Sequence, residues 1–395
     1  MKRPNLYILL LFFLLLLPFG QTTANGNDSI RLSLLTCAPG EEIYSLFGHT
    51  AIRYEDPANG IDAVFNYGLF SFNTPNFIFR FSLGETDYQL GATDYAHFAA
   101  EYAFDGRSVW QQTLNLSKEE KAELIRLLQE NYRPENRIYR YNFFYDNCAT
   151  RPRDKIEESI IGKVIYPSEP QDGSRSFRDI VHQYCKGHPW ARFGIDLCIG
   201  SEADRPITQR QMMFAPFYLM DAFAGARIAN DSIQRPLVSD KALIVDAVSD
   251  EEEGGWMPTP LQCSLLLFIL TAAATIYSLR KRTGLWGVDL VLSGTAGIVG
   301  CVLAFLALFS EHPAVSSNFL LLVFHPGQLL FLPYIIYCVR KGKKCWYLTL
   351  NLVVLTLFIV LFPVIPQRFD FAVVPLALCL LIRSASNLIL TSKKK

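Results

Sequence analysis

The last third of the chain constrains the fold most, because it consists of five long apolar stretches separated by short polar segments. These stretches cover residues 261–279, 285–309, 319–339, 346–362 and 371–390. A helix needs about 20 mostly apolar residues to cross a bilayer, and most of the stretches reach that length. The sequence therefore predicts a membrane domain of five transmembrane helices over residues 261–392.

Basic residues in alternate loops predict how these helices are oriented. The clusters lie at residues 280–282, 340–344 and 393–395, and the positive-inside rule places all three in the cytoplasm. The chain that precedes the first helix then lies outside. Asp289 and Arg383 fall near the predicted cytoplasmic ends of their helices, where snorkelling would keep the cost of their charges low.

The N-terminus has the pattern of an export signal. Lys2 and Arg3 precede an unbroken apolar run over residues 6–17, and small residues at 22–24 offer a cleavage site. We expect residues 1–24 to be a signal peptide, with an uncleaved anchor as the alternative. Either would export the next segment, which predicts a multi-pass membrane protein with its soluble domain on the outer side of the membrane.

Residues 25–245 have the composition of a soluble domain, and an acidic, glycine-containing linker at residues 246–260 joins them to the first helix. The chain has 37 basic and 37 acidic residues, so electrostatics does not favour a nucleic-acid partner. It contains no P-loop or dinucleotide-binding fingerprint. We therefore expect no cofactor.

The soluble part shows the patterns of both strands and helices. Ser117 and Glu120 form the spacing of a capping box at the start of an amphipathic helix, and a second helix is expected from Cys148 or Thr150 to Ile161. Strands are predicted at residues 30–36, 49–54, 63–67, 109–116 and 138–144. The prediction is an α+β domain built on a small antiparallel sheet.

Cys148 and His49 are the candidate reactive pair. Cys148 follows the turn residues Asp146 and Asn147 just before a predicted helix, and His49 opens a predicted strand. Such a pair can form a thiolate–imidazolium nucleophile. A helix N-terminus and an imidazolium would each lower the pKa of the thiol below its usual ~8.5. A buried, unreactive cysteine is the plainer alternative.

Other cysteines have simpler interpretations. Cys37 precedes a Pro-Gly turn but is not followed by a clear helix. Cys185 and Cys198 lie close together in an exported segment, which predicts a disulfide. With His182 and His188 they loosely match a zinc site, but not in a familiar order, and we expect no metal.

Four blocks of sequence resemble the DUF4105 family, the family of the Bacteroidetes lipoprotein N-acyltransferases (Lnb). The blocks are residues 34–40, 45–53, 65–68 and 141–151, and the resemblance spans about residues 32–161, with a fitting helical tail. It implies a circularly permuted papain-like domain, akin to NlpC/P60 and lecithin:retinol acyltransferase proteins. In that arrangement the histidine strand precedes the cysteine helix.

The resemblance also implies roles for single residues. Cys148 would be the nucleophile and His49 the base, with Asn66 on a neighbouring strand as the third group and Tyr67 as its alternative. Asn66 could equally cap the end of its strand. Arg151, which ends the last block, is a candidate substrate contact. A helix that begins at Thr150 would place Pro152 in its first turn and Cys148 just outside it.

Polar residues on the membrane side are candidate lipid contacts. His312 and Asn318 lie in a predicted outer loop, and His325 lies inside the third apolar stretch beside Pro326. The alternative for His312 is an ordinary surface histidine. The alternative for His325 is a hydrogen bond to backbone groups that Pro326 leaves unpaired. Residues 212–223 could rest on the bilayer, although packing in the core is favoured.

The function that the resemblance implies is transfer of an acyl chain from a lipid ester, through a thioester on Cys148, to the α-amine of a lipoprotein N-terminal cysteine. With a pKa near ~8, an α-amine is about one-tenth neutral at pH 7 and is a sensible acceptor. The expected partners are membrane phospholipid and bacterial lipoprotein, and the resemblance implies a multi-pass protein of a Gram-negative inner membrane with the catalytic domain in the periplasm. A membrane-tethered cysteine peptidase or amidase acting on cell-wall peptide and a non-enzymatic scaffold remain the alternatives.

Overall fold

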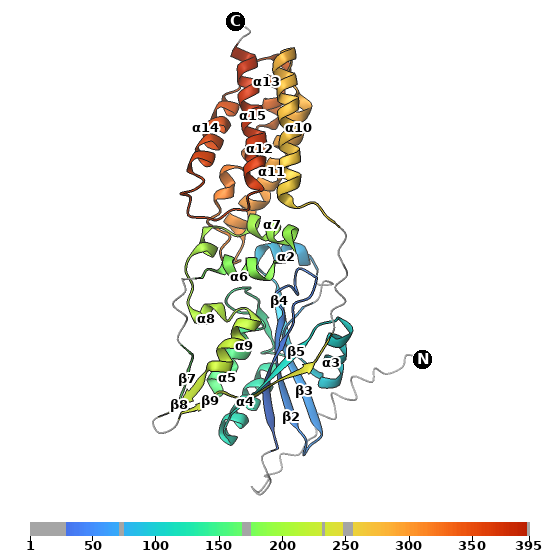
Figure 1. The fold of residues 1–395 in the computed structure, drawn as a ribbon, viewed down its shortest axis with the longest axis vertical. Helices are drawn as coiled ribbons and strands as arrows, with labels where there is room; N and C mark the ends of the chain where they lie inside the picture. Colours follow the sequence, from blue (N-terminus) through green and yellow to red (C-terminus); the bar gives the residue numbers. More distant parts are fainter. Residues whose placement is uncertain (1–28, 71–74, 168–174, 231–233, 248–255, 393–395) are drawn as a thin grey trace, which may run out of the picture.

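The computed structural model describes residues 29–70, 75–167, 175–230, 234–247 and 256–392. A sheet domain lies at one end of the long axis and a bundle of helices at the other (Figure 1). The predicted signal peptide and the middle of the acidic linker lie outside the described residues.

A seven-stranded antiparallel sheet forms the centre of the soluble domain, in the order β10-β5-β1-β2-β3-β4-β6. Its strands are β1 (Arg31–Cys37), β2 (His49–Asp56), β3 (Ile61–Leu69), β4 (Asp87–Asp94), β5 (Val109–Leu114), β6 (Ile138–Arg140) and β10 (Val238–Val245). Five of these were predicted. The pattern missed β4 and β10, because β4 mixes glycine and polar residues and β10 is exposed along most of its length.

Helices cover both faces of the sheet. α3 (Tyr95–Phe104) packs on one face, and α4 (Lys118–Tyr132), α5 (Thr150–Ser159) and α9 (Pro216–Gly225) pack on the other. The larger core lies under the second group and includes Leu34, Ile52, Leu124, Ile156 and Phe223. The predicted capping box of Ser117 and Glu120 is present. Residues 212–223, which include most of α9, pack in the core as expected and include the buried Leu219 and Phe223.

Smaller elements lie between the sheet and the helical bundle or at the far edge of the domain. They are α2 (Phe77–Leu83), α6 (Phe177–Tyr184), α7 (Pro189–Cys198), η1 (Ser201–Asp204) and α8 (Gln209–Met212), with a second sheet of β7 (Lys163–Ile165), β8 (Arg227–Ala229) and β9 (Gln234–Pro236). Figure 1 shows α2, α6 and α7 beneath the bundle.

The described helical region does not contain five continuous spans. Three helices have the length and composition to cross a membrane: α10 (Pro260–Lys281), α11 (Trp286–Phe309) and α15 (Val373–Ser392). The third predicted helix is instead η2 (Phe319–Leu322), α12 (Gly327–Leu330) and α13 (Leu332–Lys341), bent by 72°, and could count as a fourth span. Pro326 and Pro333 lie at its breaks, where proline cannot continue the hydrogen-bond ladder. α14 (Trp346–Leu361) has only 16 residues.

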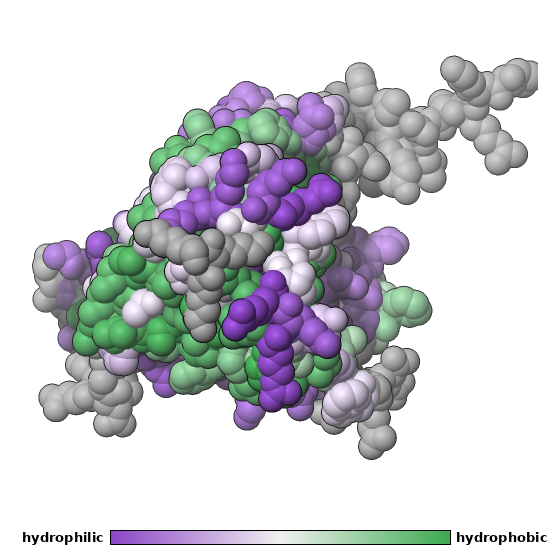
Figure 2. Space-filling model, turned by 90° about the horizontal axis from the view of Figure 1, so that it is seen from above, coloured by the Kyte–Doolittle hydropathy of each residue, from purple (hydrophilic) through white to green (hydrophobic). Residues whose placement is uncertain are grey.

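Hydrophilic and basic residues gather at the tip of the bundle farthest from the soluble domain, as is typical of the end of a membrane domain. Figure 2 shows hydrophilic residues at the tip of the bundle beside hydrophobic flanks; α10 and α13 both end in basic residues. The expectation for Asp289 and Arg383 is wrong. They do not snorkel but form a buried ion pair at 2.8 Å, to which Asn387 adds a hydrogen bond.

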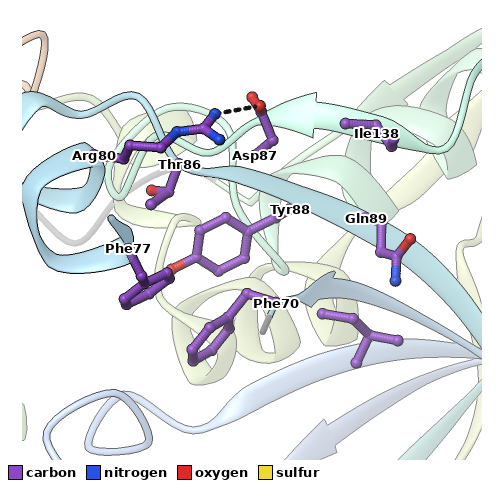
Figure 3. Close-up of a pocket in the computed structure, with 9 residues that line it drawn as sticks. Phe70, Phe77, Arg80, Thr86, Asp87, Tyr88, Gln89 and Ile138 are labelled. Atoms are coloured by element: carbon purple, nitrogen blue, oxygen red, sulfur yellow. Dashed lines mark hydrogen bonds and ion pairs between the residues drawn. The ribbon is translucent and has the colours of Figure 1, made fainter. Parts of the chain in front are cut away.

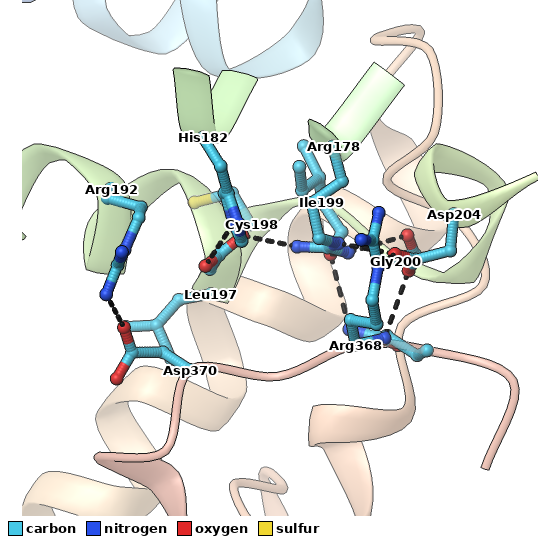
Figure 4. A network of polar contacts seen from close by, with 12 residues as sticks. Arg178, His182, Arg192, Leu197, Cys198, Ile199, Gly200, Asp204, Arg368 and Asp370 are labelled. Atoms are coloured by element: carbon cyan, nitrogen blue, oxygen red, sulfur yellow. Dashed lines mark hydrogen bonds and ion pairs between the residues drawn. The ribbon is translucent and has the colours of Figure 1, made fainter. Parts of the chain in front are cut away.

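A network of ion pairs, which we call the joint, connects the soluble domain to the bundle and is buried around Arg178 but half exposed at Arg368 (Figure 4). Arg178 is completely buried and bonds Asp196 at 2.5 Å and Asp204 at 2.9 Å. Arg368, from the loop after α14, bonds Asp204 at 2.8 Å and Asp179 at 2.5 Å. The two parts are therefore held together by specific charged contacts.

Candidate active site

His49 is placed by a tight turn at the start of β2. Gly48 has a φ of 79°, and a Cβ there would lie 2.5 Å from the carbonyl oxygen of Cys37, so only glycine fits. β2 and β3 are antiparallel with Ala51 opposite Asn66, which puts His49 and Asn66 on one face of the sheet. His49 Nε2 and Asn66 Oδ1 are 3.2 Å apart.

Asn66 is itself held in place, and Tyr67 is engaged elsewhere. Asn66 Nδ2 donates to Thr93 Oγ1 at 3.3 Å. Tyr67 is on the opposite face of β3, where its hydroxyl donates to Asn131 Oδ1 at 2.8 Å. Of the two predicted third groups, only Asn66 bonds the imidazole.

Cys148 is positioned by the side chain of the residue before it. Asn147 Oδ1 accepts from the backbone N–H groups of Ala149 and Thr150 at 2.8 and 2.9 Å. Its Nδ2 donates to two carbonyl oxygens, of which the one on Phe214 is 67 residues away in the chain. α5 begins at Thr150, so Cys148 lies just outside the helix, and Pro152 falls in the first turn as expected.

The Cys148 thiol meets the sheet between β2 and β3. The backbone N–H of Thr50, the residue after His49, is directed at the sulfur, as is that of Cys148 itself. A Cβ on Gly68 would lie 3.6 Å from the Cys148 Cβ. The structure therefore brings Cys148, His49 and Asn66 to one end of the sheet. Among the described residues, the Cys148 thiol and the His49 ring form no hydrogen bond with each other.

Burial favours the neutral forms of the Cys148 thiol and the His49 imidazole. Burial raises the pKa of Cys148 to about 11, against the lowering effect of the two backbone N–H groups. Burial also lowers the pKa of His49 to about 4, although the Asn66 hydrogen bond opposes this. Burial therefore opposes the predicted thiolate–imidazolium pair in the substrate-free site.

Tyr139 belongs to the site and was missed by sequence reasoning. Its hydroxyl is buried and makes no hydrogen bond within the described residues, and it would lie 3.9 Å from a Cβ on Gly68, on the side that Cys148 also faces. A tyrosine in a predicted strand looks like core, so only its position two residues before the block at residues 141–151 could have signalled a role.

Arg151 is bound within the protein. It forms a bidentate pair with Asp146 at 2.6 and 2.7 Å and stacks at 3.6 Å over the ring of Tyr139. These contacts fix the turn before Cys148 and the position of Tyr139. In the structure, the Arg151 guanidinium is therefore occupied by contacts within the protein and supports the turn before Cys148.

The three candidate lipid contacts, His312, Asn318 and His325, contact α2, α7 and the bundle rather than Cys148. The His312 ring contacts the carbonyl oxygen of Phe81 at 2.5 Å. Asn318 is buried and donates to the carbonyl oxygen of Leu197 at 2.7 Å. His325 lies 3.4 Å from the hydroxyl of Tyr347 within the bundle. Asn318 therefore links the two domains.

The remaining cysteines do not compete with Cys148. Cys185 and Cys198 are both free, so the predicted disulfide is wrong; Cys185 instead packs in an apolar cluster. Burial raises the pKa of Cys37 to about 12. His182 bonds Asp196 at 2.8 Å in the joint.

These features define a class: a membrane protein whose α+β domain carries Cys, His and Asn at one end of its sheet, with the histidine strand before the cysteine helix. Two family models match the chain, the Lnb N-terminal periplasmic domain over residues 21–172 and the Lnb transmembrane domain over residues 251–395. The chain therefore belongs to the Lnb family and has a periplasmic domain. Searches of curated proteins and of solved structures gave no match.

Proposed function

We propose that this protein is a lipoprotein N-acyltransferase of the inner membrane, in which Cys148 is the nucleophile, His49 the general base and Asn66 the group that orients the imidazole. Family membership suggests the activity. The observation that carries the mechanism is geometric: the sulfur lies against Thr50, and the adjacent His49 is bonded to Asn66.

The first half-reaction forms a thioester. His49, neutral because of its lowered pKa, takes the proton of the thiol as the sulfur attacks the carbonyl carbon of a lipid ester. The C–O bond to the alcohol then breaks, and the imidazolium returns the proton to the leaving oxygen. The backbone N–H of Cys148 and the unpaired hydroxyl of Tyr139 are the donors available to the oxyanion.

The second half-reaction passes the acyl chain to an amine. The α-amine of a lipoprotein N-terminal cysteine attacks the thioester and loses its proton to His49, and the C–S bond breaks to release the thiol. An α-amine with a pKa near ~8 needs little activation, whereas a lysine amine near ~10.4 is almost fully protonated at pH 7.

The location of the site supports a lipid substrate. Phe47 and Phe144, which flank the two reactive residues in sequence, pack in one cluster with Ala314 from the loop after α11. The reactive end of the sheet thus faces the membrane bundle, where both the ester donor and the lipid-modified acceptor are held.

The test is mass spectrometry of lipoprotein N-termini in a host that lacks other N-acyltransferases. The wild-type chain should add one amide-linked acyl chain, and Cys148→Ala should add none. Cys198→Ala, another cysteine of the exported domain, is the matched control and should behave as wild type. An N-acyl chain still added by Cys148→Ala at normal protein level would refute the mechanism, and cleavage of cell-wall peptide without N-acylation would establish the hydrolase instead.

A further inference from the structure

Helix α2 exposes an unusually apolar surface. None of its residues is buried, and Ile78, Phe79 and Phe81 are 81%, 57% and 46% exposed. A soluble surface rarely carries such a contiguous patch unless the patch binds something. Figure 1 places α2 directly beneath the membrane helices.

The patch continues the lipid-facing surface of α11. Phe79 lies 5.9 Å from Phe305, measured between ring centroids. The backbone N–H of Glu311 donates to the carbonyl oxygen of Leu83 at 2.8 Å, which fixes α2 to the outer end of α11. Phe309 at that end is itself 65% exposed. One apolar surface therefore runs from the membrane-spanning helix onto α2.

Behind α2 is a cavity of about 270 Å³ between α2, the end of β3, β4 and β6. Three aromatic rings line it (Figure 3): Phe70 stacks on Phe77 at 5.7 Å and lies 5.0 Å from Tyr88. Arg80 of α2 also lines it and is paired with Asp87 at 2.8 Å, with Arg140 on the other carboxylate oxygen at 3.0 Å. The cavity thus combines an aromatic interior with the Arg80 guanidinium, and the Arg140 guanidinium lies beside it, paired with Asp87 and also 3.6 Å from Glu311.

The cavity adjoins the reactive cysteine. Leu69, another lining residue, directly follows Gly68, against which the Cys148 Cβ rests. Tyr88 stacks at 4.2 Å on Tyr141, and Cys148 packs against the same core cluster. An acyl chain lying in the cavity would therefore have its carboxyl end close to the sulfur.

We propose that α2 lies in the outer leaflet and that the aromatic cavity behind it takes up the acyl chain of a phospholipid, the ester of which is presented to Cys148. This assignment of the donor rests on the proposed function. A lipoprotein's own diacylglyceryl group has the same acyl chemistry but no phosphate. Arg80 and Arg140 favour the phospholipid, because guanidinium groups beside an apolar slot at the interface match a phosphate head group.

Photolabelling of the full-length Cys148→Ala chain in phospholipid vesicles tests the site without turnover. The probes are a phosphatidylethanolamine and a synthetic diacylated lipopeptide, each with a diazirine on one acyl chain. The phospholipid probe should label residues 75–88 at least about fivefold more than the segment around Phe104, which is 92% exposed on α3. Label from both probes confined to the bundle, or at residues 75–88 from the lipopeptide alone, would overturn the proposal.

Paired substitutions test the two parts of the proposal separately. Ile78→Asp should reduce labelling of residues 75–88 about tenfold, and Phe104→Asp should leave it within about twofold. Ile138→Trp, at the cavity, should shift acyl transfer towards shorter chains by about tenfold, and Leu243→Trp, on the opposite edge strand, should not. Equal behaviour within either pair would overturn that part. Because labelling needs no acyl transfer, a chain that binds the probe but never N-acylates would refute the function and leave the lipid site standing.

Discussion

The site around Cys148 and the joint around Arg178 are both buried, yet they treat charge in opposite ways. At the site, burial shifts the pKa of the thiol up and that of the imidazole down, and the contacts are to an amide and to backbone N–H groups. At the joint, guanidinium and carboxylate groups are paired at 2.5 to 2.9 Å.

The difference follows from what each group can do when it loses water. Cysteine and histidine escape the cost of burial by becoming neutral, whereas arginine cannot be deprotonated and must find a partner. Neutral groups suit the nucleophile proposed for Cys148, which should act only when substrate arrives. Paired ions suit the joint, where Arg368 bonds the same Asp204 that Arg178 holds within the soluble domain.

The largest expected effect is the pH dependence of thiol alkylation. With a pKa of about 11, the thiolate fraction of Cys148 should rise about tenfold per pH unit, or about 1000-fold from pH 7 to 10. The same peptide in the urea-unfolded chain should level off above about pH 9. Peptide mapping after iodoacetamide treatment measures both, and a plateau near pH 9 in the folded chain would contradict a buried neutral thiol. As pH falls, the imidazole should be protonated only near pH 4.

The next effect concerns the joint. Arg178→Met should destabilise the full chain by about 3–5 kcal/mol, because it removes a completely buried guanidinium from the buried Asp196 and the partly buried Asp204. Thermal unfolding in detergent measures the change. Arg126→Met, which breaks an exposed pair on α4, is the control and should leave the melting temperature unchanged. Equal melting temperatures for the two variants would show that the buried pairs of Arg178 do not stabilise the soluble side of the joint.

The smallest effect distinguishes the role of Asn66 from that of Thr93, which accepts a hydrogen bond from it. Asn66→Ala should lower the turnover of acyl transfer about 10- to 100-fold with little change in KM, because the imidazole loses the group that orients it. Thr93→Val removes only the hydrogen bond behind Asn66 and should cost less than about tenfold. Asn66→Asp keeps an oxygen acceptor and should recover part of the activity. A larger loss in Thr93→Val than in Asn66→Ala would indicate a purely structural role.

Much of the soluble domain could be predicted because its signals are local. The strand that begins at His49, the capping box at Ser117 and the start of α5 after Cys148 all depend on neighbouring residues. The predicted disulfide failed because proximity of Cys185 and Cys198 in sequence says nothing of where α6 and α7 direct them. Five continuous spans are not confirmed, because prolines break the third apolar stretch, which hydropathy alone does not register.

The sequence by itself determined the division into an exported domain and an apolar helical region, and it marked Cys148 and His49 as a candidate pair, to which the family resemblance added Asn66. Hydropathy, basic clusters and turn residues act over short distances, so they can be read without a fold. Only the tertiary structure decided that burial favours the neutral forms of Cys148 and His49, that Asp289 pairs with Arg383, and that α2 joins the apolar surface of α11. Desolvation and ion pairing depend on segments distant in the chain, which meet only when the sheet and the bundle have formed.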